Sequence, residues 1–262
     1  MPRFEPNPAR RPSIVTGASS GIGAATAVAL AGAGHPVALG ARRVERCEEA
    51  AERIRAAGGE AVALPLDVGD DESVRKFVAA AVESLGPIEI LVSGAGGLAP
   101  SPIHELDSET FAEQVGINLV GAHRLVSAVV PDMVGRRRGD VVFVGSDVVP
   151  APRPGMGGYV AAKSGLEAMA YTMRMELEGT GVRASIVRPG PTVSDLAAGW
   201  DQQATLTMLE SWQQWGFARH PYFLRASDIA AAVTTVVSAP RGVHLTLVEV
   251  QPEAPLREVP DA

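Results

Sequence analysis

A short strand-like segment, a glycine-rich turn and an alanine-rich run follow one another near the start of the chain. Residues 13–16 are Ser-Ile-Val-Thr, residues 17–23 are Gly-Ala-Ser-Ser-Gly-Ile-Gly, and the alanine-rich run continues to about residue 33. A brief apolar run bounded by glycine is typical of a buried strand, and an alanine-rich run is typical of a helix. The turn is therefore predicted to lead from a strand directly into a helix.

The same alternation of short strands and helices continues along the chain. We predict further strands at residues 36–40, 61–66, 88–92, 141–145, 182–187 and 243–250. We predict helices at residues 44–57, 71–85, 108–134 and 227–238, and around Tyr159. Strands that alternate with helices form a parallel sheet covered on both faces. The predicted fold class is α/β: a Rossmann-type, doubly wound parallel sheet of about seven strands in a three-layer α/β/α arrangement.

Pro65 indicates where one of these strands lies in the sheet. Proline has no backbone N–H, so it cannot donate a hydrogen bond to a neighbouring strand. The strand at residues 61–66 contains Pro65 and is therefore predicted to lie at an edge of the sheet.

The chain divides into one domain and two tails. Residues 1–12 contain four prolines and three arginines and are predicted to form a flexible N-terminal tail. Residues 13–251 are predicted to form a single domain, and residues 252–262 a C-terminal tail. The longest uncharged stretch, residues 14–41, has six glycines and divides into strand, helix and strand, so we do not interpret it as a membrane span.

Charge and cysteine content narrow the function classes. A net charge of −7 argues against a nucleic-acid-binding surface, and the basic cluster at residues 136–138 is short. The single cysteine, Cys47, rules out an internal disulfide and fits a reducing compartment, so we expect a cytoplasmic protein. The histidines are scattered without a metal-binding motif, so we expect no metal.

The glycine-rich turn is suited to binding an anion. Backbone N–H groups at the amino end of a helix, together with the helix dipole, favour a phosphate there. Gly17, Gly21 and Gly23 are spaced differently from the common Gly-x-Gly-x-x-Gly fingerprint. Residues 17–21 also match Gly-x-Ser-x-Gly, the turn of serine hydrolases, with Ser19 as nucleophile. No strand precedes it to supply an oxyanion loop, so this alternative is the weaker one.

The end of the second predicted strand bears on the choice of cofactor. An acidic residue at this position would bind the ribose 2′-hydroxyl of NAD. This chain has Ala41 followed by Arg42 and Arg43, and a guanidinium suits the 2′-phosphate of NADP. The alternative is that both arginines merely begin a solvated, charged helix.

Tyr159 and Lys163 are candidates for acid–base chemistry. Four residues apart on a helix, their side chains share one face. A nearby cation favours the phenolate and lowers a tyrosine pKa. Ser146 follows the strand at residues 141–145, and the carboxyl ends of parallel strands are where such sheets bind ligands. The three residues are expected to meet in one cleft, although a Tyr and a Lys at this spacing also occur on ordinary surface helices.

Several short motifs follow one another along the chain in the order typical of a known family. They are Thr16, Gly17, Gly21, Ile22 and Gly23, then Asp67 and Val68, residues 93–96, Asn118, Ser146, Tyr159, Lys163 and residues 188–190. In their order and spacing the chain resembles the single-domain short-chain dehydrogenase/reductase family. The resemblance implies an NADP-dependent oxidoreductase that interconverts an alcohol and a carbonyl, commonly as a homodimer or homotetramer.

The resemblance also implies roles for individual residues. Tyr159 would be the general acid/base, Lys163 would bind the nicotinamide ribose and lower the Tyr159 pKa, Ser146 would orient the substrate oxygen, and Asn118 would complete a proton relay. The cofactor would be contacted by Gly17, Ser19, Ser20, Gly21, Ile22, Gly23, Arg42, Arg43, Asp67, Val68, Gly94, Ala95, Gly96, Tyr159, Lys163, Pro189, Gly190, Thr192 and Val193. The chain departs from the family at Ser93 and Gly94, where two asparagines are usual, and looser local packing is expected there.

Aromatic residues gather in one segment near the end of the chain. Between residues 200 and 223 lie half of the twelve aromatic residues, including all three tryptophans, and Met208, Trp212 and Trp215 form a helical stripe. In the family this region, about residues 194–224, is the substrate lid, so a bulky, largely apolar substrate is our hypothesis. Alternatively the stripe packs on the core or on a neighbouring subunit. A non-catalytic dinucleotide-binding sensor or scaffold is the other alternative function.

Overall fold

The computed structural model describes residues 5–193, 202–217 and 220–256. Its sheet has seven parallel strands in the order β3-β2-β1-β4-β5-β6-β7, which confirms the predicted fold class. The strands are β1 (Ser13–Thr16), β2 (Val37–Ala41), β3 (Ala61–Pro65), β4 (Ile90–Ser93), β5 (Gly139–Val144), β6 (Val182–Pro189) and β7 (Leu247–Val250). The helices are α1 (Gly21–Gly32), α2 (Val44–Ala56), α3 (Asp71–Leu85), α4 (Ser108–Val115), α5 (Gly121–Gly135), α6 (Gly157–Glu176), α7 (Gln202–Gln214) and α8 (Ala226–Ser238).

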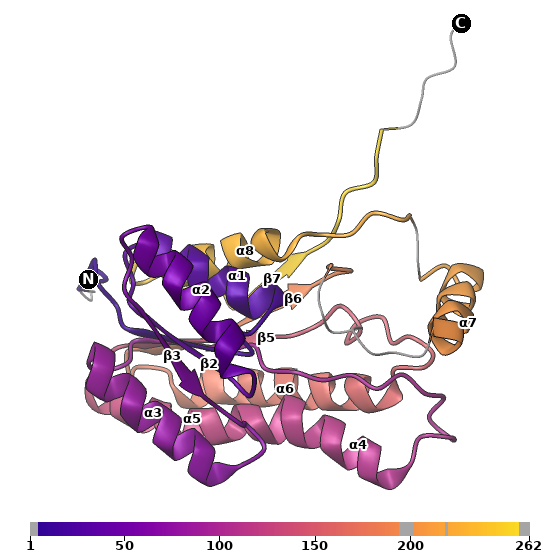
Figure 1. Ribbon diagram of the computed structural model, residues 1–262, viewed down its shortest axis with the longest axis horizontal. Helices are drawn as coiled ribbons and strands as arrows, with labels where there is room; N and C mark the ends of the chain where they lie inside the picture. The colour runs from indigo at the N-terminus through magenta and orange to yellow at the C-terminus, as the bar shows by residue number, and fades with distance from the viewer. Residues whose placement is uncertain (1–4, 194–201, 218–219, 257–262) are drawn as a thin grey trace, which may run out of the picture.

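Helices cover both faces of the sheet (Figure 1). α1, α2 and α8 lie on one face, and α3, α5 and α6 lie on the other. Because successive strand residues point to opposite faces, Ile14 and Phe143 join the core beneath α3, α5 and α6, whereas Val15 and Val142 join the core beneath α1, α2 and α8. A parallel sheet buried on both faces accounts for the nearly continuous apolar runs of its strands.

The edge position of β3 is confirmed. β3 pairs only with β2 in the seven-stranded sheet, and Pro65 at its end is exposed. The last strand differs from its prediction, since the strand begins at Leu247 and the alternating residues 243–246 before it are irregular. The long helix predicted at residues 108–134 is present as α4 and α5 joined by a π-helical turn, η1 (Gly116–Val120).

The chain reverses its direction of travel across the sheet at β1. β2 lies on one side of β1 and β4 lies on the other. The loops that follow β1 and β4 therefore separate from each other, and open α/β sheets bind ligands in the crevice formed at such a point. Both loops are glycine-rich in this chain, which places the predicted cofactor residues at this crevice.

The N-terminal segment departs from its prediction. Arg11 lies within the expected flexible tail, yet it is only 1% exposed. Its guanidinium forms ion pairs with Glu89 and Asp140 and donates to the Val237 carbonyl oxygen at 2.8 Å. Asp140 is buried and also pairs with Arg183, so Arg11 helps to neutralise a carboxylate that would otherwise be costly to bury. The tail is therefore shorter than the 12 residues predicted.

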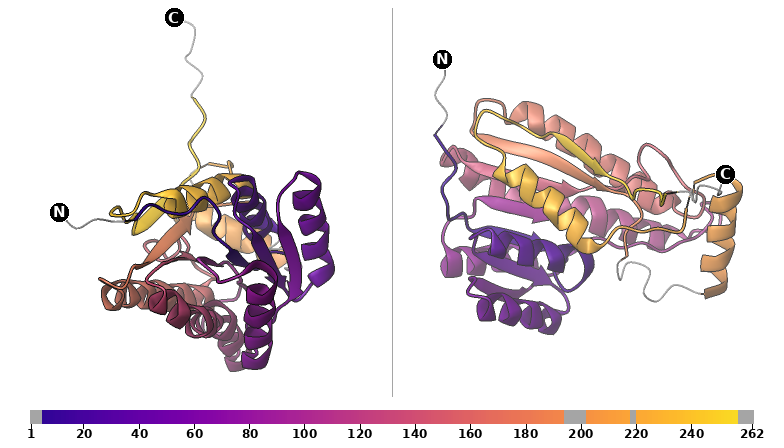
Figure 2. Two further views of the ribbon diagram at one scale, coloured as in Figure 1. Left: turned by 90° about the vertical axis from the view of Figure 1, so that its left-hand side faces the viewer. Right: turned by 90° about the horizontal axis from the view of Figure 1, so that it is seen from above.

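The aromatic segment contributes a helix of its own. Figures 1 and 2 show α7 standing apart from the two helical layers, beyond the carboxyl ends of the strands. Residues 194–201 and 218–219 of the expected lid lie outside the described residues. Among the helices described, none combines the length and the apolar character needed to cross a bilayer.

Candidate active site

A cavity of about 420 Å³ lies at the carboxyl ends of the strands, at the crevice between the β1 and β4 loops. Every residue predicted to bind the cofactor lines it, apart from Pro189, Gly190, Thr192 and Val193. Its walls also include residues that were not predicted to contact the cofactor: Gly40, Ala41, Leu66, Gly97, Ile117 and Val144. Most of these additional residues are next to predicted residues at the ends of strands. Their position beside the end of a buried strand is the sequence feature from which they could have been predicted.

The turn after β1 requires glycine for steric reasons. Gly17 has a φ of +70°, and a Cβ there would lie 2.8 Å from the Gly94 carbonyl oxygen. A Cβ at Gly23 would lie 2.3 Å from the Gly17 carbonyl oxygen. α1 begins without a side-chain cap and without an acidic residue in its first turn. Its amino end therefore keeps backbone donors available to an anion in the cavity.

The loop after β4 is attached to β1 by a side chain. The Thr16 hydroxyl accepts hydrogen bonds from the backbone N–H groups of Gly94 (3.1 Å) and Ala95 (3.2 Å). A Cβ at Gly94 would lie 2.9 Å from the Thr16 carbonyl oxygen. The expectation of looser packing at Ser93 and Gly94 is therefore wrong, because the missing side chain allows the two backbones to approach closely.

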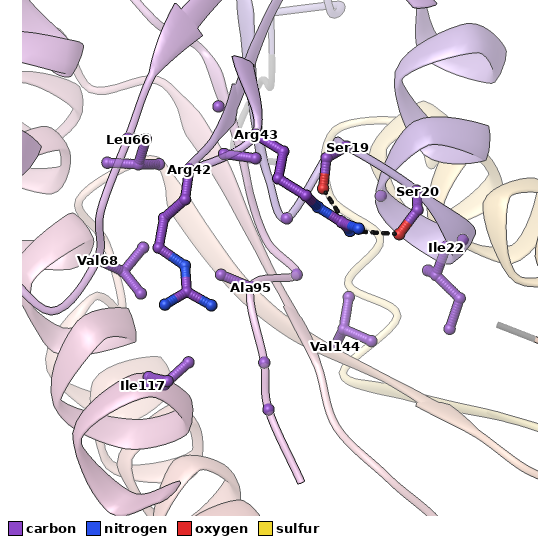
Figure 3. A pocket seen from close by; sticks show the side chains of 18 of the residues that line it. Ser19, Ser20, Ile22, Arg42, Arg43, Leu66, Val68, Ala95, Ile117 and Val144 are labelled. Carbon is purple, nitrogen blue, oxygen red and sulfur yellow. Dashed lines mark hydrogen bonds between the residues drawn. The ribbon is translucent and has the colours of Figure 1, made fainter. Parts of the chain in front are cut away.

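Arg42 and Arg43 differ in direction although they are neighbours (Figure 3). The Arg43 guanidinium donates to the hydroxyls of Ser19 (3.1 Å) and Ser20 (3.3 Å) in the glycine turn. Arg42 points into the cavity between Val68 and Ile117. A cation thus lies at this end of the cavity, where an acidic residue would be needed for a ribose hydroxyl.

The predicted acid–base residues gather at the other end of the cavity. α6 carries Tyr159 and Lys163 one turn apart, and these side chains are 7% and 3% exposed. Ser146 follows β5 and is 8% exposed. The Lys163 ammonium donates to the Val144 carbonyl oxygen at 2.8 Å and lies 5.5 Å from the centre of the Tyr159 ring.

The pKa of Tyr159 differs from its prediction. Burial raises the Tyr159 pKa to about 12, the nearby Asp147 carboxylate adds to this effect, and a hydrogen bond with Ser146 opposes it. Burial lowers the Lys163 pKa to about 8, and the Glu167 carboxylate opposes that shift. Lys163 is not among the groups that shift the Tyr159 pKa, so the predicted lowering of this pKa by Lys163 is not seen. Tyr159 remains protonated at neutral pH and is a potential proton donor.

Asn118 lies in η1, where the π-helical turn directs its side chain inward. Its amide nitrogen donates to the carbonyl oxygens of Gly97 (2.7 Å) and Gln114 (2.8 Å). Its amide oxygen is buried without a hydrogen-bond partner. A Cβ at Gly96 would lie 2.9 Å from that oxygen and 3.8 Å from the Lys163 nitrogen, so the oxygen faces the same space as Lys163. An unpaired acceptor here fits a bound water or a ligand hydroxyl.

The segment after β6 does not line the cavity. The Thr192 hydroxyl donates to the Gly190 carbonyl oxygen at 2.8 Å, and the Val193 N–H donates to the Leu224 carbonyl oxygen at 2.9 Å. Val193 is 67% exposed. The structure therefore does not bring these predicted cofactor contacts together with the others.

The family model for short chain dehydrogenases matches residues 13–205. The chain belongs to this family. It is 35% identical to a glycine betaine reductase of Emericella nidulans, over 92% of this chain but only 18% of that protein. It is 32% identical to a 2,3-dihydro-2,3-dihydroxybenzoate dehydrogenase of Bacillus subtilis, over 90% of this chain and 91% of the relative.

Solved structures of dehydrogenases have the same fold. An alcohol dehydrogenase from Thermococcus sibiricus in complex with 5-hydroxy-NADP superposes with a TM-score of 0.79, at 29% identity, over 94% of this chain and 100% of that one. A metagenomic short-chain oxidoreductase in complex with NADP has a TM-score of 0.78 at 27% identity, over 94% and 98% of the two chains. As a short-chain dehydrogenase, the chain is an oxidoreductase that acts on alcohol or carbonyl groups with a nicotinamide dinucleotide.

The site of this short-chain dehydrogenase fits such a dinucleotide. The glycine turn leaves no room for side chains where a pyrophosphate would approach, and the buried Asn118 oxygen lacks a partner within the protein. The hydrolase alternative lacks support, because the Ser19 hydroxyl bonds to Arg43 and no histidine lines the described cavity. Within the described ranges, no cluster of His, Cys, Asp and Glu is arranged to hold a metal ion.

Proposed function

We propose that this chain is an NADP-dependent short-chain dehydrogenase that interconverts an alcohol and a carbonyl on a bulky, largely apolar substrate. One observation carries the proposal: the cavity is lined by Arg42 and Arg43 at one end and by the buried Tyr159 and Lys163 at the other, and Tyr159 is hydrogen-bonded to the buried Ser146. A scaffold that only binds a dinucleotide has no need of a buried acid and a buried ammonium in contact with the same space.

The chain's own residues supply binding and proton transfer. When bound, the dinucleotide supplies the hydride for carbonyl reduction or accepts it in alcohol oxidation. Ser146 and Tyr159 hold the substrate oxygen between their hydroxyls, and Tyr159 donates its proton to that oxygen. Its pKa of about 12 keeps the hydroxyl protonated until the oxygen becomes basic.

Lys163 and Asn118 return a proton to Tyr159 after Tyr159 has protonated the substrate. The pKa of Lys163, lowered to about 8 by burial, lets its ammonium give up a proton near neutral pH. The unpaired Asn118 oxygen is positioned to hold a water molecule beside Lys163, which would link the ammonium to solvent. This relay gives the π-helical turn a function, because a regular helix would aim Asn118 differently.

Two observations and one chemical argument support NADP over NAD. The residues that follow β2 at the cavity are Arg42 and Arg43, and neither is acidic. A guanidinium is suited to a 2′-phosphate by charge and by its planar set of donors. The two solved relatives described above are complexes with NADP or a hydroxylated NADP.

A titration tests the proposed cofactor and activity together. The purified protein is mixed with NADPH or NADH while nicotinamide fluorescence is followed, and consumption of the reduced cofactor is then measured with a panel of aryl and alkyl ketones. We expect NADPH to bind at least about tenfold more tightly than NADH, and bulky ketones to be reduced. Absence of binding would contradict the proposal. Tight binding without turnover of any ketone would favour the non-catalytic alternative.

The surroundings of Tyr159 support an apolar substrate. Its ring packs in a small cluster with Val148, Met156 and Met208. Met208 comes from α7 and is 7% exposed. Nearby, the Trp212 indole N–H donates to the Pro154 carbonyl oxygen at 2.9 Å, which attaches α7 to the loop after β5. A substrate that reaches Tyr159 would therefore meet apolar side chains from this loop and from α7.

Shortening Met208 is expected to change the size of substrate accepted. In Met208→Ala, kcat/KM for a ketone with a larger apolar group should rise relative to a smaller one by about tenfold, as expected for a few methylene-sized contacts. Leu209→Ala is the matched control, because Leu209 is next to it on α7 but is 36% exposed. Equal kcat/KM ratios in wild type and Met208→Ala would remove this residue from the substrate pocket.

A further inference from the structure

A buried ion pair joins the helix that carries Tyr159 and Lys163 to the sheet. Glu167 lies on α6, one turn beyond Lys163, and is 2% exposed. Arg188 of β6 donates to both of its carboxylate oxygens, from Nε at 3.1 Å and from Nη2 at 2.7 Å. The remaining nitrogen, Nη1, donates to Glu249 of β7 at 2.8 Å. One guanidinium thus connects α6, β6 and β7.

The Glu167 carboxylate also contacts the backbone that leads to Ser146. A Cβ at Gly145 would lie 2.7 Å from Glu167 Oε1, so the carboxylate occupies the space that a side chain there would need. One turn earlier, Lys163 donates to the carbonyl oxygen of Val144, the residue before Gly145. Successive turns of α6 therefore hold successive residues at the end of β5.

β6 holds the same backbone from the other side. The Gly145 N–H donates to the Val187 carbonyl oxygen at 2.8 Å, and the Asp147 N–H donates to the Pro189 carbonyl oxygen at 3.0 Å. Both residues flanking Ser146 are thus bound to the residues flanking Arg188. The ion pair lies where α6, β6 and the Ser146 loop meet.

We propose that Glu167 is a positioning residue for the reaction: held by Arg188, it fixes α6 against the Ser146 loop and keeps the Lys163 side chain charged. This inference rests on the proposed function, in which Lys163 acts as an ammonium. A buried ion pair can also serve only to stabilise a fold, so the test needs a property of Lys163 itself.

The groups around Lys163 determine the expected electrostatic effect. Tyr159 and Glu167 face it from α6, Asp147 follows β5 and acts on Tyr159, and Arg188 lies beyond the Glu167 carboxylate. Burial lowers the Lys163 pKa, and the Glu167 carboxylate is the charge that opposes this shift. Removing that charge should lower the Lys163 pKa further, so that the ammonium loses its proton at a lower pH.

The sequence makes Lys163 directly observable, because the chain contains only two lysines, Lys76 and Lys163. In the ligand-free protein labelled with ¹³C-lysine, two Cε signals are followed by NMR as the pH rises, and Lys76→Arg assigns them. Lys76 is exposed on α3, so its signal is an internal reference. We expect the Lys163 midpoint near pH 8 in wild type and about one unit lower in Glu167→Gln.

Two variants separate this effect from loss of the ion-pair network in general. Glu249→Gln removes the 39%-exposed partner of the same Arg188 and should leave the Lys163 midpoint unchanged. Glu167→Asp keeps the charge and should largely restore the wild-type midpoint. If Glu167→Gln fails to fold, the double variant Glu167→Gln/Arg188→Leu replaces it, because it removes both charges of the buried Glu167–Arg188 ion pair, and its midpoint is also expected to fall.

The outcomes for Glu167 and for the proposed function are distinguishable. The NMR midpoint needs neither cofactor nor turnover, and an unchanged midpoint in Glu167→Gln overturns the inference. With NADPH and a ketone, the loss of kcat at alkaline pH should move to lower pH in Glu167→Gln by the same amount as the midpoint. A wild-type protein that turns over no ketone contradicts the proposed function, whatever the Lys163 midpoint shows.

Discussion

The Tyr159→Phe variant is expected to lose about 10²- to 10⁴-fold in kcat, the range typical of a positioned general acid. The substitution removes only the hydroxyl that donates the proton. The phenyl ring keeps its place among Val148, Met156 and Met208, so the fold should be preserved. The measurement is the single-turnover rate of ketone reduction by the NADPH-bound variant, which separates the chemical step from product release.

Two controls accompany Tyr159→Phe. NADPH affinity, followed by fluorescence, should change little, because the glycine turn and Arg42 are at the other end of the cavity. Tyr171→Phe is the matched variant, since Tyr171 is on the same helix but is 36% exposed, and it should turn over as the wild type does. Near-normal turnover in Tyr159→Phe would mean that another group donates the proton.

The sheet could be predicted because its determinants are local. Each buried strand is a short apolar run, and each is followed by turn residues and a helix, so the order of elements can be read without knowing any distant contact. The Arg11 contacts could not be predicted in this way. Its partner Asp140 is 129 positions away, and only the folded sheet brings the two together. Residues 243–246 are irregular although their sequence alternates as in a strand, so the pattern alone gave too long a strand.

The candidate site shows the same division between local and distant determinants. The helical spacing of Tyr159 and Lys163 predicts a shared face, and the structure places both in one cavity. The pKa of Tyr159 was mispredicted because spacing on a helix reveals a neighbouring charge but not the degree of burial. Glu167 was missed because Arg188 lies 21 positions away and on another element.

The second large effect is expected on NADPH binding when Arg42 is replaced. Arg42→Ala should weaken NADPH binding by about 1–3 kcal/mol, which is roughly a 5- to 150-fold increase in Kd, and should leave NADH binding nearly unchanged. The physical reason is that NADH lacks the 2′-phosphate with which the Arg42 guanidinium would pair. Because Arg42 is exposed at the cavity, the NADPH advantage of the wild type should also shrink as the salt concentration rises.

Arg43→Ala is the control variant with which the Arg42→Ala result is compared. Arg43 donates to the hydroxyls of Ser19 and Ser20, so its loss should loosen the turn that both cofactors share and should weaken NADPH and NADH alike. Equal losses for both cofactors in Arg42→Ala would indicate a change in the fold. A selective loss of NADPH in Arg43→Ala alone would place the 2′-phosphate beside the glycine turn, because only a direct contact distinguishes two cofactors that differ in that one group.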